Sequence, residues 1–205
     1  MPAIIGKKIG MTQVFTEDGT RVPVTVIEAA PNTVTAVRSP DGDGYAAVQL
    51  AGIPTEERKL TKPERGHLAK AGAPPSKVVA EFRDEAPEAQ IGESLTVEQF
   101  EPGQRVKVSA TAIGKGFQGT IKRHNFSRGP VTHGSHNVRA PGSIGASADP
   151  ARVFRGVKMP GRMGGKRVTE RGLEVVEVDQ ERNLLLLRGA VPGPKGGTVE
   201  VRGDG

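Results

Sequence analysis

Alternating hydrophobic and polar positions in the opening fifty residues predict β-strands. Residues 22–26 alternate valine with other side chains, residues 33–37 are rich in β-branched side chains, and residues 45–50 form another extended run. Glycine and acidic residues that suit tight turns lie between these runs, at 17–20 and 41–44. This pattern is typical of antiparallel β-structure.

The pattern changes between residues 55 and 70, where charged residues become frequent. Pro63 opens a stretch that has Glu64 in its first turn and Gly72 beyond its end. Proline near the start and glycine past the end are typical of a helix, so we expect one or two short helices here.

Further strand patterns lie on both sides of residues 114–168. In residues 105–113, valines and alanines alternate with basic or hydroxyl side chains. The other predicted strands are residues 77–83, 173–179, 184–188 and 198–202. The fold class we expect is mainly β: a barrel from residues 1–113 and 169–205, a small α+β insertion at about 55–100, and a long basic loop at 114–168.

Charge is divided unevenly along the 205 residues. Residues 105–168 hold 13 of the 29 Lys and Arg, 11 of the 28 glycines and one carboxylate, Asp149, for a net charge of +12. The remainder has 16 basic and 22 acidic residues, for a net charge of −6. This segregation predicts a polyanionic partner for the basic segment, and nucleic acid fits best.

Composition narrows the classes of protein further. The chain has no cysteine, so it forms neither a disulfide framework nor a thiolate metal site. The absence of cysteine is compatible with a reducing compartment. Residues 1–10 mix isoleucine with lysine and lack a long apolar run, which argues against a signal peptide or a membrane span.

Residues 114–119 match the pattern G-x-G-x-x-G, which occurs in dinucleotide-binding enzymes. That fold also needs a βαβ unit with an acidic residue about 20 positions later, whereas here the next acid is Asp149. We favour the interpretation that these glycines allow the backbone to turn tightly or to approach a phosphate closely. A nucleotide-dependent enzyme is the alternative, and a free nucleic-acid-binding or translation-factor-like module is the third class.

Other candidate chemistry in the basic segment is weak. His124, His133 and His136 could suggest a metal site, but they lack a nearby cysteine or carboxylate set and a rigid scaffold. The serines of the segment have no G-x-S-x-G context. We therefore expect no catalytic residue, metal, cofactor or small-molecule substrate, and we assign the histidines to RNA contacts or to solvation.

Phosphate binding fits the basic segment because its cations are spread along a glycine-rich backbone and can follow a folded RNA. The predicted rRNA-binding residues are Lys115, Lys122, Arg123, His124, Arg128, His133, His136, Arg139, Arg152, Arg155, Lys158, Arg162, Lys166 and Arg167. Phe117, Phe126 and Phe154 could stack on bases or pin the segment to the barrel, and we favour pinning.

Several motifs closely resemble those of the bacterial ribosomal protein L3 family of the large subunit. They are GKGFQGTIKRHNFSRGP at 114–130, THGS at 132–135, APGSIG at 140–145, RVF at 152–154, KMPGRMGG at 158–165, GAVPGPKG at 189–196 and IIGKKIGMTQ at 4–13. The resemblance implies a six-stranded antiparallel barrel of the translation-protein type, in a structural component of the cytoplasmic large ribosomal subunit.

The resemblance also implies partners. They are the 23S rRNA near its 3′ end, bound early in subunit assembly, and neighbouring ribosomal proteins such as L14 and L19. The loop tip would approach the peptidyl transferase centre and comprises Gly142, Ser143, Ile144, Gly145, Ala146, Ser147 and Asp149. Many relatives have a methylated glutamine where this chain has Ala146, so that modification cannot occur here.

Overall fold

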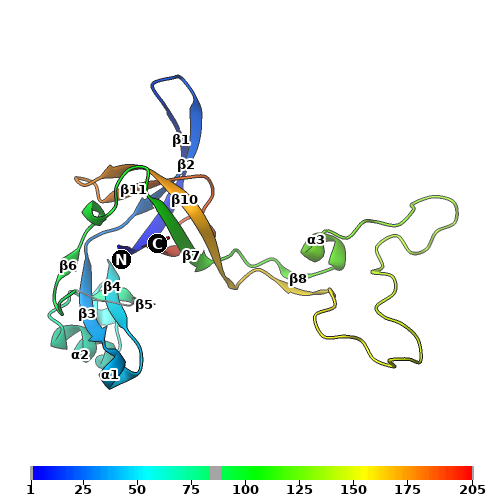
Figure 1. Ribbon diagram of the computed structural model, residues 1–205, viewed down its shortest axis with the longest axis horizontal. Coiled ribbons are helices and arrows are strands. Elements are labelled where there is room, and N and C mark those ends of the chain that lie inside the picture. The colour runs from blue at the N-terminus through cyan, green and yellow to red at the C-terminus, as the bar shows by residue number, and fades with distance from the viewer. Residues whose placement is uncertain (1, 84–88, 205) are drawn as a thin grey trace. The chain divides into compact units, whose positions relative to one another are not determined.

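Strands from both ends of the chain close a six-stranded antiparallel barrel (Figure 1), in a computed structural model that describes residues 2–83 and 89–204. The order around the barrel is β1–β12–β7–β10–β11–β2. The bounds are β1 Ala3–Phe15, β2 Arg21–Glu28, β7 Arg105–Thr111, β10 Arg167–Asp179, β11 Leu184–Arg188 and β12 Thr198–Gly203. The predicted fold class is confirmed.

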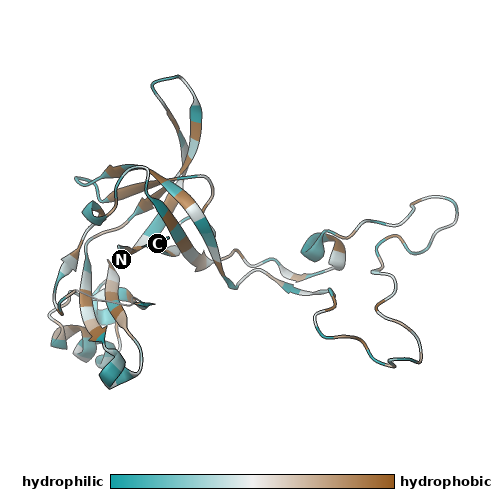
Figure 2. Ribbon diagram, in the orientation of Figure 1, coloured by the Kyte–Doolittle hydropathy of each residue, from teal (hydrophilic) through white to brown (hydrophobic). Residues whose placement is uncertain are grey.

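Alternation along the barrel strands separates a hydrophobic interior from a polar exterior. On β7, Val106 and Val108 are fully buried and Ala110 nearly so, while the residues between them face outward. Leu185 and Leu187 of β11 contribute to the same core in the same way. Hydrophobic residues are accordingly interspersed along these strands in Figure 2.

A second, four-stranded sheet has the order β5–β4–β3–β6. Its strands are β3 Asn32–Arg38, β4 Ala47–Pro54, β5 Ser76–Arg83 and β6 Ser94–Leu95. The short helices are α1 Pro40–Asp43, η1 Glu57–Lys59, α2 Lys62–Lys70 and η2 Val97–Gln99. The α+β part thus takes up β3 and β4, which we had expected in the barrel, and begins before the predicted residue 55. Residues 84–88 of the predicted insertion lie outside the described residues.

β1 contributes to both cores because its successive side chains point to opposite faces. Ile4 lies in the barrel core, whereas Ile5 packs against Val34 and Leu50 of the second sheet. Neither isoleucine exposes any surface. The sequence pattern did not predict this strand, since residues buried on both faces lack a simple alternation.

The described residues divide into two compact units, 1–112 with 167–205 and 113–166. In the second unit, β8 Gly116–Gln118 pairs antiparallel with β9 Gly161–Met163, and α3 spans Thr120–His124. Residues 125–160 contain neither helix nor strand. These short elements were not predicted, and neither was the first part of β10, where residues 167–172 lack apolar alternation. No helix of the described residues is long and apolar enough to cross a membrane.

Candidate nucleic-acid interface

The G-x-G-x-x-G motif forms the base of the 113–166 unit. Gly116 opens β8 with a positive φ of 67°, and Gly119 precedes the five-residue helix α3. The Lys115 amide donates a hydrogen bond of 2.9 Å to the carbonyl of Met163, which brings the two ends of the unit together. β8 pairs antiparallel with β9, whereas a dinucleotide site needs parallel strands. The pairing therefore argues against a dinucleotide site, and Gly116 is the glycine of the motif whose positive φ other residues rarely adopt.

Two of the predicted rRNA ligands hold the unit together instead of facing solvent. Arg123 donates from Nη1 to the carbonyl of Met159 at 2.6 Å, and His124 Nε2 lies 3.0 Å from the same oxygen. A Cβ at Gly161 would lie 2.6 Å from Arg123 Nη1, so a larger residue here would displace the guanidinium from its present position. Arg123 and His124 therefore connect α3 to the segment that returns along β9.

Most of the remaining predicted ligands are exposed. They are Lys115, Lys122, Arg128, His133, His136, Arg139, Arg152, Arg155, Lys158, Arg162 and Lys166. None of these side chains forms an ion pair with a carboxylate of the described residues. The unit therefore presents many cations whose charge is uncompensated, which is the arrangement that a polyanion would stabilise.

Arg167 differs from the other predicted ligands. It begins β10 in the barrel unit, and its guanidinium forms an ion pair with Glu200 of β12. The pair compensates the charge of Arg167, which makes this side chain less suited to a phosphate than the unpaired cations. The sequence could not reveal this partner, because residues 167 and 200 meet only once the barrel has closed.

The phenylalanines of the basic segment differ in their exposure. Phe117 is 78% exposed and Phe154 is 56% exposed, so neither ring is buried within the 113–166 unit, and pinning to the barrel stays a prediction. The Arg152 guanidinium lies over the Phe154 ring, 5.6 Å from its centroid. Phe126 is partly buried, with its centroid 6.2 Å from that of His124. Exposed rings beside cations suit stacking on unpaired bases.

The predicted loop tip, residues 142–149, is exposed throughout. Ser143 donates a hydrogen bond of 2.9 Å to the carbonyl of Gly145, and Gly142 has a positive φ of 80°. A shallow hollow is lined by residues 143–147 and 151–153. Apart from Asp149 the tip carries no charge, so it lacks the means to bind phosphates strongly.

Comparison with known proteins identifies similar sequences. A family model described as Ribosomal protein L3 matches residues 72–184. The large ribosomal subunit protein uL3 of Synechococcus sp. (strain JA-2-3B'a(2-13)) is 53% identical over 200 residues, which are 97% of this chain and 94% of the relative. The proteins of the same name from Natranaerobius thermophilus and Acidothermus cellulolyticus are each 54% identical over 97% of this chain, and over 95% and 90% of their own lengths.

Proposed function

Because the chain belongs to the ribosomal protein L3 family, and is thus a structural component of the large ribosomal subunit and not an enzyme, we propose that its basic segment binds 23S rRNA near the 3′ end of that RNA. The proposal rests chiefly on one observation. The exposed cations of residues 113–166 have no carboxylate partner among the described residues.

The binding mechanism we propose is neutralisation of phosphates by side chains along an irregular backbone. Each phosphate contact releases condensed counterions, so affinity depends steeply on salt concentration. If roughly six to ten cations made such contacts, affinity would fall by about 10³ to 10⁵ between 50 and 200 mM salt. The eleven exposed cationic or histidine side chains described above can supply that number.

Two further roles follow from the family. We propose that this binding occurs early in subunit assembly, and that residues 142–149 extend toward the peptidyl transferase centre. Their exposure and low charge support a tip that fills space within RNA instead of anchoring to it. Neighbouring large-subunit proteins, with L14 and L19 as the candidates, would complete the environment.

The test of rRNA binding reverses the charge of Arg155, Lys158 and Arg162 together, each to glutamate. We expect weaker binding to a large-subunit rRNA transcript and a salt-dependence slope that is smaller by about 2 to 3, because three phosphate contacts are lost. Binding titrations at several salt concentrations measure both quantities.

The matched control reverses Lys62, Lys70 and Lys77, which are exposed cations of the other unit. It changes the net charge equally and should leave the slope nearly unchanged. Thermal melting of both variants checks that each is folded. An unaltered slope in the Arg155, Lys158 and Arg162 variant would refute the proposed interface.

A further inference from the structure

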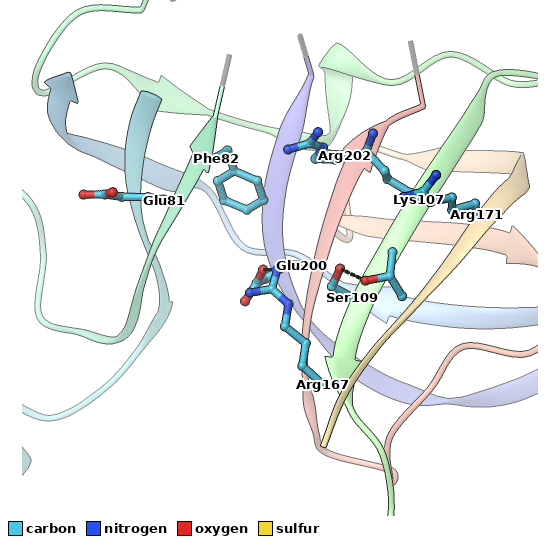
Figure 3. A pocket seen from close by; sticks show the side chains of 9 residues that line it. Glu81, Phe82, Lys107, Ser109, Arg167, Arg171, Glu200 and Arg202 are labelled. Carbon is cyan, nitrogen blue, oxygen red and sulfur yellow. Dashed lines mark hydrogen bonds and ion pairs between the residues drawn. The ribbon is translucent and has the colours of Figure 1, made fainter. Parts of the chain in front are cut away.

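A second group of cations lines a groove in the barrel unit. The groove lies between β5 and the outer face of β7, β10 and β12 (Figure 3). Its lining residues are Glu81, Phe82, Lys107, Ser109, Arg167, Thr169, Arg171, Glu200 and Arg202. None of them lies in residues 113–166, whose exposed cations form the interface proposed above.

Three of these cations, Lys107, Arg171 and Arg202, lie close together in the groove (Figure 3). Arg202 of β12 is directly opposite Lys107 of β7 in the antiparallel register. Ser109 of β7 is opposite Thr169 of β10, and the register then shifts between Glu170 and Leu173. Arg171 lies within this irregularity and lines the same groove as Lys107. Figure 3 shows the three cations beside one another across these strands.

The nearby carboxylates compensate these cations only in part. Asp204 lies 3.6 Å from Lys107, and Glu200 is paired with Arg167. Glu81 accepts hydrogen bonds from Tyr45 Oη at 2.9 Å and Gln49 Nε2 at 3.1 Å.

The two arginines of the row lack such partners. Arg202 Nε is buried without a hydrogen-bond partner among the described residues. Arg171 forms no ion pair with any carboxylate of residues 2–83 and 89–204. No carboxylate of the described residues therefore compensates the charges of these two arginines.

Like charges directly opposite one another on paired strands are destabilising. A buried Nε without a partner adds a desolvation cost. Both costs would be removed by an oxygen-rich anion bound in the groove. The hydroxyl groups of Ser109 and Thr169, whose oxygens are 2.7 Å apart, provide additional hydrogen-bonding groups for such a ligand.

We propose that this groove binds the phosphodiester backbone of rRNA, as a second contact independent of residues 113–166. The inference rests on the proposed function, because it concerns the same RNA. Apart from the nearly buried Phe82, the groove is lined by charged and hydroxyl side chains. A protein partner normally needs aromatic or aliphatic anchors, so phosphate is the better match than an acidic peptide.

The test uses the full chain with the double substitution Arg171→Gln and Arg202→Gln. The salt-dependence slope of binding to a large-subunit rRNA transcript should fall by about 1.4 to 1.8, since two phosphate contacts are lost. The free protein should melt at an unchanged or higher temperature, because the row of like charges is relieved. Arg171→Lys with Arg202→Lys retains the charges and should retain the slope.

Lys62→Gln with Lys77→Gln is the matched control, with the same change of charge at exposed positions elsewhere in the unit. The groove proposal would be refuted if the slope were unchanged in the Arg171 and Arg202 variant but reduced in the Arg155, Lys158 and Arg162 variant. The proposed function would then still hold. Unchanged slopes in both would overturn both. The groove proposal would also be refuted if the double glutamine variant melted at a lower temperature and bound RNA more weakly, and if the double lysine variant did not restore binding. That result would show that the two arginines have a structural role.

Discussion

At the scale of single residues, Asn32 shows how one side chain can join two sheets. It is fully buried, and its Oδ1 accepts a hydrogen bond of 2.8 Å from the Ile5 amide. Its Nδ2 donates to the carbonyls of Ile5 at 3.0 Å and Ala30 at 2.7 Å. The side chain thus satisfies backbone groups of β1 as a neighbouring strand would.

We expect Asn32→Ala to reduce the free energy of unfolding by about 2 to 4 kcal/mol. The substitution leaves buried backbone groups of Ile5 without partners, and each unsatisfied group costs about 1 to 3 kcal/mol. Urea denaturation measures the loss. Asn137→Ala, at an exposed position of the other unit, should stay within about 0.5 kcal/mol, and an equally small effect at Asn32 would contradict this role.

At the scale of elements, local hydrogen bonding sets where α2 begins. The amide and the hydroxyl of Thr61 each donate a hydrogen bond of 2.8 Å to the Glu64 carboxylate. These bonds, the one from the backbone first, hold the pKa of Glu64 below its ordinary value. The sequence already indicated this start, because Pro63 and Glu64 are typical of a first helical turn.

The lowered pKa of Glu64 predicts a pH dependence of stability. A carboxylate whose pKa is lower in the folded chain stabilises it above the ordinary pKa, and this contribution disappears as the pH falls through the folded value. The melting temperature of Glu64→Gln should therefore lie below that of the unmodified chain at pH 7, and the difference should shrink toward pH 3.

Asp18→Asn, in the turn between β1 and β2, provides the matched control for Glu64. Its difference from the unmodified chain should not follow the same course with pH. A Glu64→Gln difference that stays constant from pH 7 to pH 3 would argue against the carboxylate as the source of the stabilisation.

At the scale of the whole molecule, charge is segregated between the two units. The barrel unit pairs many of its charges, as Arg188 does with Glu174 at 3.0 Å, whereas residues 113–166 contain one carboxylate, Asp149. All the lysines and arginines of the basic segment lie outside its tip. Docking to RNA and any action of the tip should therefore be separable.

Replacing residues 142–149 by two glycines tests this separation. We expect the affinity for the rRNA transcript to change by less than about threefold, because the segment contributes no cation to phosphate contacts. Peptidyl transferase activity of subunits reconstituted with the variant should fall. A complete loss of rRNA binding would show instead that the tip carries the docking.

The sequence alone determined most of the strands other than β1, β8 and β9, the short helices near residues 57–70 and the position of the basic segment. These features depend on local alternation, capping residues and charge, which can be read over a few neighbouring residues. Family motifs added the six-stranded barrel, which local patterns could not specify.

Only the tertiary structure assigned β3 and β4 to a second sheet and β1 to both cores. It alone showed the ion pair of Arg167 with Glu200 and the hydrogen bond of Arg123 to the Met159 carbonyl. It also showed that Arg202 is opposite Lys107. Such contacts join residues far apart along the chain. The physical reason is that strand register and burial are set by the closure of the whole barrel, which no local pattern contains.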